Sequence, residues 1–247
     1  MDILTIIEKG FEKINIDKKY KENALKFIEL WLTDPQFADY VPQIEYLVKQ
    51  ANWDTLLDCF YQIIPFGTAG RRGEVGIGPN RINTWTIMSS AQGHSQYLIQ
   101  KFGEEAKSRG VVISYDVRIY KETDIYDTKR KNPIYNLDCK ILSEVAATVY
   151  AYNGIRTYLF KNYTSTPEMS FMVKYKNAVA GDMISASHNP PEFNGIKVVN
   201  DFGGQLIPPH DQELVDIVEK QTEAIKFLPF KDAQQKGLII YLTEAEH

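Results

Sequence analysis

Residues 185–189 read SASHN, and in them a serine, a histidine and an asparagine, whose side chains can take part in catalysis, follow one another. Serine offers a hydroxyl, His188 an imidazole that can give or take a proton, and Asn189 an amide. No G-x-S-x-G sequence surrounds either serine, and neighbouring residues of a turn rarely form a hydrolase-type Ser–His pair, which argues against a triad hydrolase. The serine could instead carry a covalent phosphate. The alternative is a structural turn in which Ser and Asn bond to the local backbone.

A second candidate site is the glycine-rich segment 63–80, which holds five of the chain's 15 glycines within 12 residues. Gly67, Gly70 and Gly73 are spaced by three, with Arg71 and Arg72 between the last two. Exposed main-chain N–H groups beside guanidinium groups suit an anion. The segment is neither a Walker A loop nor a dinucleotide-binding turn, because no Gly-Lys-Ser/Thr follows and no helix opens directly behind it. We expect a loop here, either a phosphate cradle or a flexible connection.

Alternating apolar and helical segments must position these residues. We expect strands at 111–117, 155–160, 178–186 and 194–201. We expect helices at 86–109, 139–153, from Pro167 onward, and 211–225. This order predicts an α/β fold with a mixed, mostly parallel sheet sandwiched by helices. The serine turn then follows a strand at the carboxyl edge of the sheet, where such folds bind ligands.

The chain divides into three parts by pattern. Residues 1–62 are predicted to form a helical N-terminal extension, because apolar stripes at helical spacing run through them. Residues 63–230 are predicted to form the main domain. Residues 231–247 are interpreted as a linker or the start of a second domain. A new apolar run begins at Leu238 and stops abruptly, so this end looks like a cut within a larger architecture, with a natural terminus as the alternative.

Composition excludes several classes of protein. Hydrophobic residues make up 44% of the chain and aromatic residues 12%, which is typical of a globular protein. The net charge of -4 argues against nucleic acid as the main partner. No apolar run reaches the ~18 residues of a membrane span, and the N-terminus lacks the features of a secretory signal. Cys59 and Cys139 have no metal-ligand spacing, so we expect reduced thiols in a cytoplasmic protein with no membrane partner.

Four motifs carry a family resemblance: GTAGRRG (67–73), SYDVR (114–118), TPEMSF (166–171) and SASHNPPEFNGIKV (185–198). In this order they resemble the α-D-phosphohexomutase family of phosphoglucomutases and phosphomannomutases. The most specific signal is S/T-A-S-H-N-P followed by N-G-x-K. With the helical extension and GPNRIN (78–83), the chain looks most like the branch of long phosphoglucomutases and phosphopentomutases. The resemblance covers residues 63–225 and extends more loosely to the extension.

The resemblance implies a role for each matching residue. Ser187 would be the phosphoserine, which phosphorylates a sugar phosphate and regains a phosphate from the bisphosphorylated sugar; a sugar bisphosphate would also be the activator. His188 matches a general acid/base, and Arg72 and Lys197 match cations at the transferring phosphate. The implied contacts to the phosphosugar come from Thr68, Gly70, Arg72, Ser187, His188, Asn189 and Lys197.

Four neighbouring residues are expected to act less directly. Asp116 and Arg118 are expected to support the serine turn, with a purely local ion pair as the alternative. Arg71 occupies a variable position of its motif, so we expect it to face solvent. Ser185 is expected to be a bystander.

The departures from the family pattern decide what this chain could do alone. The family binds Mg²⁺ through the phosphate of the serine, here Ser187, and three aspartates of a D-G-D-x-D-R loop, which this chain lacks. Its G-E-x-S-G loop and C-terminal phosphate-binding motif are absent too, and Val117 replaces a small polar residue. We predict the N-terminal part of a mutase that interconverts sugar 1- and 6-phosphates, or pentose 1- and 5-phosphates, and that is inactive alone. The alternatives are a naturally short, non-catalytic phosphosugar- or partner-binding protein, and a sugar bisphosphate synthase of the same fold.

Overall fold

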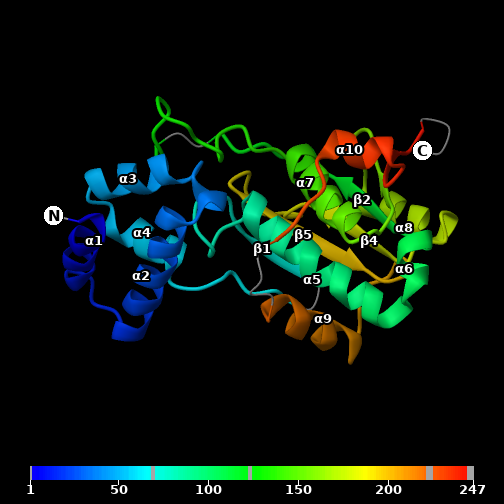
Figure 1. Ribbon diagram of the computed structural model, residues 1–247, viewed down its shortest axis with the longest axis horizontal. Coiled ribbons are helices and arrows are strands. Elements are labelled where there is room, and N and C mark those ends of the chain that lie inside the picture. The colour runs from blue at the N-terminus through cyan, green and yellow to red at the C-terminus, as the bar shows by residue number, and fades with distance from the viewer. Residues whose placement is uncertain (1, 68–69, 122–123, 221–224, 244–247) are drawn as a thin grey trace.

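The computed structural model describes residues 2–67, 70–121, 124–220 and 225–243. Within them a six-stranded sheet lies between helices, and a group of short helices packs at one end of it (Figure 1). The strand order is β1-β5-β4-β2-β3-β6. Strands β2, β3, β4 and β6 run parallel, and β5 and β1 are antiparallel to their neighbours. The prediction of a mixed, mostly parallel α/β sheet is confirmed.

Four strands form where the apolar runs predict them, with shorter bounds. They are β2 (Val111–Tyr115), β3 (Thr157–Leu159), β4 (Ala180–Ile184) and β5 (Phe193–Val199). Every residue of β2 and β4 is buried, as expected of central strands covered on both faces. The serine turn, residues 185–192, joins β4 to β5, and this places it where β4 ends.

The glycine-rich segment is not wholly a loop, because Gly70–Glu74 forms β1 and pairs with β5. Gly70 lies opposite Lys197 with a φ of 122°, and a Cβ on it would stand 1.9 Å from the Ile196 oxygen. A Cβ on Gly195 would stand 2.3 Å from the Arg71 oxygen. The glycines that suggested a loop are therefore what allows the two backbones to approach and pair.

Helices cover both faces of the sheet. One face packs against α7 (Cys139–Tyr152) and α5 (Thr84–Phe102), and the other against α8 (Thr166–Tyr175). Successive residues of β2 divide between the two cores: Val111 and Ile113 join the α5 and α7 side, while Val112 packs with Met169 and Met172 of α8. Three shorter helices pack further out: α6 (Glu104–Arg109), α9 (His210–Glu219) on α5, and α10 (Phe230–Gln235) on α7. The single helix expected at 86–109 is broken at Gly103, whose φ is 57°.

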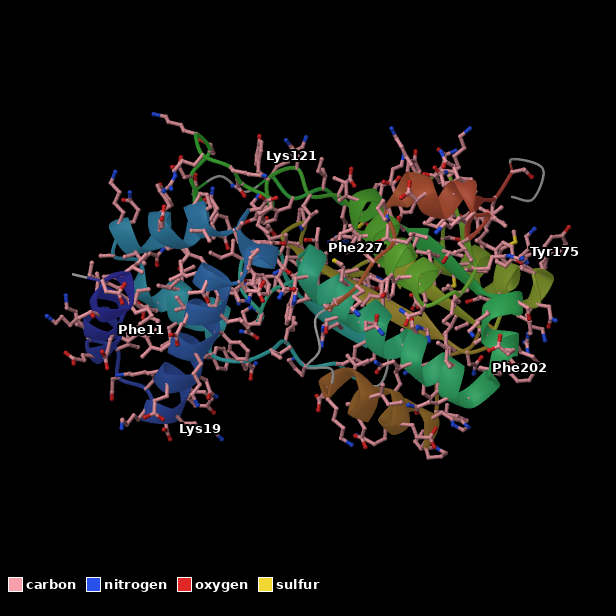
Figure 2. All side chains as sticks on the ribbon, in the orientation of Figure 1. Phe11, Lys19, Lys121, Tyr175, Phe202 and Phe227 are labelled. Carbon is pink, nitrogen blue, oxygen red and sulfur yellow. The ribbon has the colours of Figure 1, made fainter. Side chains whose placement is uncertain are left out.

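The N-terminal extension shares a continuous core with the domain. It contains α1 (Ile3–Glu12), α2 (Lys18–Thr33), the short 3-10 helix η1 (Pro35–Phe37), α3 (Val41–Lys49) and α4 (Trp53–Phe60). Trp31 is fully buried, stacks on Phe37 at 4.2 Å and meets Trp85 of α5 edge to face at 5.9 Å. Phe11 lies in this group of helices, and Tyr175 and Phe202 lie at the opposite end of the molecule (Figure 2).

A long segment between β2 and α7, described at residues 116–121 and 124–138, ties the extension to the sheet (Figure 1). Gln43 of α3 is fully buried, donates to the main-chain oxygens of Asp127 and Lys131 at 3.1 and 2.7 Å, and accepts from the Asp127 amide at 2.8 Å. Lys131 also pairs with Asp39 at 2.6 Å. Because the same segment begins at Asp116, the extension is linked to the residues that follow β2.

The last described segment joins the same sheet. Strand β6 (Ile239–Tyr241) runs parallel to β3, with Thr157 opposite Ile239. The domain boundary expected at residue 230 stays a prediction. Strand β6 lies beyond this residue and is hydrogen-bonded to β3 of the same sheet. In the described part of the chain, no helix has the length and apolar character needed to cross a membrane.

Candidate active site

The serine turn holds Ser187 in a strained, defined conformation. Its φ is 59°, in the left-handed region that non-glycine residues seldom occupy. The Ser187 Oγ lies 3.0 Å from Nδ1 of His188, with the two side chains partly or well exposed. We expect neighbours on a turn rarely to form a hydrolase-type Ser–His pair, and here the hydroxyl and the imidazole do lie within hydrogen-bond distance. The left-handed backbone at Ser187 brings the hydroxyl and the imidazole together.

Ser185 is not a bystander. Its side chain is 5% exposed, and its Oγ accepts a hydrogen bond from the Ser187 amide at 2.9 Å. A turn of this kind leaves that amide without a main-chain partner, so the hydroxyl satisfies a donor that would otherwise be unpaired. Ser185 therefore helps to set the backbone on which Ser187 is presented.

Arg118 connects the end of β2 to the serine turn. Its guanidinium donates to the main-chain oxygens of Ser187 at 2.7 Å, Pro190 at 2.8 Å and Phe193 at 3.2 Å. Its Nε also pairs with Asp116 Oδ2 at 3.1 Å. Asp116 and Arg118 thus form a local ion pair, and Arg118 at the same time bonds to the serine turn.

Cys139 adds a further contact to this arrangement. Its Sγ lies 3.0 Å from Asp116 Oδ1 and donates to it, and the same oxygen accepts from the Arg118 amide at 3.0 Å. Burial, followed by the hydrogen bond to Asp116, raises the pKa of the Cys139 thiol well above its ordinary value. Cys139 therefore stays a neutral donor that orients the carboxylate of Asp116.

Arg72 and Lys197 project from the same face of the β1–β5 pair. Arg72 lies opposite Gly195, two residues before Lys197, so both side chains leave that face. Arg72 Nη1 donates to Asn189 Oδ1 at 3.3 Å, which brings this arginine to the serine turn. Burial and, next, the positive charge of Arg72 lower the pKa of Lys197, whereas Asp116 opposes this shift. The two cations are therefore close enough to repel, as in a site built for an anion.

The remaining residues of the glycine segment are placed less directly. Gly67 and Gly70 exchange main-chain hydrogen bonds of 2.8 and 3.0 Å, so the Gly70 N–H expected to cradle a phosphate is engaged within the turn. Thr68, the other expected phosphate contact from this segment, lies outside the described residues.

Arg71 does not face solvent, contrary to expectation. It is 2% exposed, and its Nη1 donates to the Thr86 oxygen at 2.9 Å and to Ser90 Oγ at 3.2 Å on α5. Successive residues of a strand point to opposite faces, so when Arg72 faces the serine turn, Arg71 must point to α5. The sequence did not reveal this, because the segment was taken for a loop.

A cavity of about 300 Å³ borders Asp116 and Arg118. Lys140, in the first turn of α7, and Lys161, two residues after β3, also line it. Sequence reasoning missed both lysines. Lys161 lies just beyond the carboxyl end of a strand and Lys140 lies at the start of a helix. These positions could have identified both lysines from the sequence.

The surroundings of Ser187 suit an anion better than a metal ion. Most side chains that gather near the serine turn are cationic or neutral, namely Arg72, Arg118, His188 and Lys197, and the carboxylate among them, Asp116, is paired with Arg118. Among the described residues, no group of three His, Cys, Asp or Glu side chains could hold a metal ion. These residues do not fit a Mg²⁺ ion on their own.

Comparison with known proteins shows what the chain is similar to. Residues 135–225 match the model of phosphoglucomutase/phosphomannomutase, alpha/beta/alpha domain I. The chain is similar to a phosphopentomutase of Mus musculus, with 32% identity over 92% of this chain and 33% of the relative. It is also similar to a phosphoglucomutase of Staphylococcus saprophyticus, with 38% identity over 64% of this chain and 25% of the relative. The chain thus spans a quarter to a third of the length of these relatives.

A solved structure shows the same fold. The crystal structure of a protein assigned as a phosphomannomutase from Thermus thermophilus aligns with a TM-score of 0.52 and 23% identity. The alignment covers 68% of this chain and 32% of that one. At this identity the likeness concerns the fold alone.

Proposed function

Because the chain belongs to the phosphoglucomutase/phosphomannomutase (α-D-phosphohexomutase) family, we propose that it carries the phosphoserine turn of a phosphosugar mutase. The reaction would interconvert a sugar 1-phosphate with its 6-phosphate, or a pentose 1-phosphate with its 5-phosphate. The observation that supports this most directly is the contact of 3.0 Å between Ser187 Oγ and His188 Nδ1 on a turn that faces Arg72.

Each phosphoryl transfer to or from Ser187 requires that a proton leave or reach its Oγ. When the phosphoryl group leaves Oγ for a sugar hydroxyl, the bond from phosphorus to Oγ breaks, the sugar oxygen bonds to phosphorus and releases its proton to solvent, and Oγ needs a proton. His188 is within hydrogen-bond distance to give it. When Oγ attacks the other phosphate of the bisphosphorylated sugar, His188 takes the proton back, and the departing sugar oxygen gains a proton from solvent. An imidazole can act as the acid in one direction and as the base in the other.

The cations would act on the phosphoryl group as it moves. A transferring phosphoryl group carries charge on three equatorial oxygens, and preorganised positive groups lower the barrier. Arg72 and Lys197 leave one face of the β1–β5 pair, and Arg72 meets the serine turn through Asn189. Arg118 would act on the backbone of the turn, since it bonds to the carbonyls of Ser187, Pro190 and Phe193.

The isolated chain is proposed to turn over substrate barely or not at all. The Mg²⁺ implied by the family resemblance has no set of protein ligands among the described residues, and the D-G-D-x-D-R sequence is absent. Neither a metal-dependent step nor sugar selection is assigned to these residues. A sugar bisphosphate activator and a cytoplasmic location are proposed with the mutase function.

Phosphopeptide mapping of the gene product purified from its native cells tests the carrier role. We expect phosphate on Ser187, and its loss in Ser187→Ala with the protein still folded. Phosphate on Ser185 instead, or on neither serine, would contradict the proposal. Assays with glucose 1-phosphate and ribose 1-phosphate in parallel, with sugar bisphosphate added, would then identify the substrate. A gene product that binds these sugars but never carries phosphate would favour the non-catalytic binding protein.

A further inference from the structure

A second cavity, of about 410 Å³, lies between the N-terminal extension and the domain. We call it the Arg71 cavity, and its walls include Asn23 and Phe27 of α2, Ile64, Arg71 of β1, and Val218 and Glu219 of α9. Arg71 and Arg72 are consecutive in β1 and point to opposite faces. The Arg71 cavity is therefore separate from the candidate active site, which Arg72 faces through Asn189.

Arg71 is a buried cation with only neutral partners in the described part of the chain. Its Nη1 bonds to the Thr86 oxygen and to Ser90 Oγ, and its guanidinium carbon lies 5.8 Å from the centre of the Phe66 ring. Burial lowers the pKa of Arg71 to about 10, so the group stays charged at neutral pH. A buried charge that forms no ion pair is costly, and this cost would fall if an anion entered the cavity.

One edge of the Arg71 guanidinium has no hydrogen-bond acceptor among the described residues. Its Nε is buried without an acceptor, and no hydrogen bond joins Nη2 to any described residue. These two N–H groups point in parallel and match two oxygens of a carboxylate or a phosphate. Glu219 lines the cavity and its charge acts on Arg71, yet the described residues show no ion pair between them.

We propose that the Arg71 cavity binds a small anionic molecule whose carboxylate or phosphate group pairs with the Nε and Nη2 edge of Arg71. The cavity is larger than a single ion requires, and Phe27, Ile64 and Val218 give it apolar walls. The body of the ligand would pack on these walls while its anionic group faces the guanidinium.

The test uses the full chain with Arg72→Met and Lys197→Met, which removes the two cations at the serine turn. Inorganic phosphate and, separately, acetate are titrated into ¹⁵N-labelled protein while the Arg71 Nε–H and the Ile64 and Val218 amides are followed by NMR. We expect saturable shifts at all three. Tighter binding of phosphate would identify a phosphate ester as the ligand class, and tighter binding of acetate a carboxylate.

Three further variants in this background sharpen the test. Arg71→Met should weaken binding at least about tenfold, because a charge-assisted bidentate contact is lost. Asn23→Trp, which puts a larger side chain into the cavity wall and leaves Arg71 unchanged, should weaken it as well. Glu219→Gln should strengthen binding several-fold, because a like charge is removed from the wall.

The opposite outcomes overturn the proposal. They are the absence of saturable shifts, unchanged affinity in both Arg71→Met and Asn23→Trp, or weaker binding in Glu219→Gln. Circular dichroism and thermal unfolding check that each variant is folded. If Arg71→Met does not fold, Asn23→Trp and Glu219→Gln still decide the outcome.

Discussion

The Nη2 atom of Arg118 donates a hydrogen bond of 2.7 Å to the main-chain oxygen of Ser187. The same guanidinium holds the carbonyls of Pro190 and Phe193 and pairs with Asp116. Arg118, three residues after the end of β2, thus holds the turn that follows β4, and these two strands are parallel neighbours in the sheet. The position of the candidate phosphate carrier therefore depends on a cation from a segment distant in sequence.

Replacing Arg118 should loosen this turn. Arg118→Ala removes donors to three carbonyls and leaves Asp116 without its partner, so we expect a loss of about 1–3 kcal/mol in the free energy of unfolding. Urea unfolding measures the loss. Lys107→Ala, which removes an exposed ion pair with Glu104, is the control and should change stability by less than about 0.5 kcal/mol. Equal effects in the two variants would show that Arg118 does not support the turn.

Ser185 should be replaceable by threonine but not by alanine. Ser185→Ala removes the acceptor of the Ser187 amide, whereas Ser185→Thr retains an Oγ. Hydrogen exchange at the Ser187 amide should be faster in Ser185→Ala and close to that of the original chain in Ser185→Thr. Unchanged protection in the alanine variant would mean that another group holds this amide.

The left-handed conformation of Ser187 predicts an unusual preference. Both Ser187→Gly and Ser187→Ala remove the hydroxyl, but only glycine adopts a φ of 59° without strain. We expect the glycine variant to be more stable than the alanine variant by about 0.5–1 kcal/mol. Thermal and urea unfolding of the pair provide the comparison. If the alanine variant is the more stable one, the backbone of Ser187 does not keep this conformation in solution.

The pKa of Lys197 should respond to both of its charged neighbours. Arg72→Met removes a positive charge and should raise the pKa, although burial, the largest cause, still keeps it below the ordinary value. Asp116→Asn removes the opposing negative charge and should lower it further. NMR titration of the Lys197 side chain measures both shifts. If the two pKa shifts have the opposite signs, Lys197 does not lie near Arg72 and Asp116.

The same shift gives the sign of a pH effect on stability. The folded chain releases the Lys197 proton at lower pH than the unfolded chain does. Stability therefore gains from this group as pH rises from the folded pKa to the unfolded one, in the alkaline range. Arg72→Met should reduce this gain, which unfolding curves at several alkaline pH values would reveal.

Neither thiol should react in the folded chain. Cys59 and Cys139 are both buried, and burial raises the pKa of Cys59 to about 11 and that of Cys139 further. A thiol reagent at pH 8 should label them only at the rate of unfolding, because the thiolate is the reactive form. Rapid labelling of either cysteine without denaturant would contradict this expectation.

Much of the fold followed from local pattern. Apolar runs at 111–117, 178–186 and 194–201 predicted β2, β4 and β5, because central strands of a covered sheet are continuously apolar. The order of strands and helices predicted the parallel sheet, and the serine turn was correctly placed at the end of a strand. These features depend on neighbouring residues, which is the information that a single sequence contains.

Several of the misses concern contacts between distant segments. Strand β1 was taken for a loop because its glycines make sense only against the backbone of β5. The burial of Arg71 followed from that pairing, and the three carbonyl contacts of Arg118 required the serine turn to lie beside the end of β2.

By itself the sequence determined which residues could carry phosphate and charge, because residue types and their spacing are properties of the sequence. Only the tertiary structure decided that Arg72 faces the serine turn while Arg71 faces the interior. The physical reason is that a strand alternates its side chains, and which face each arginine takes is settled by the strand with which it pairs.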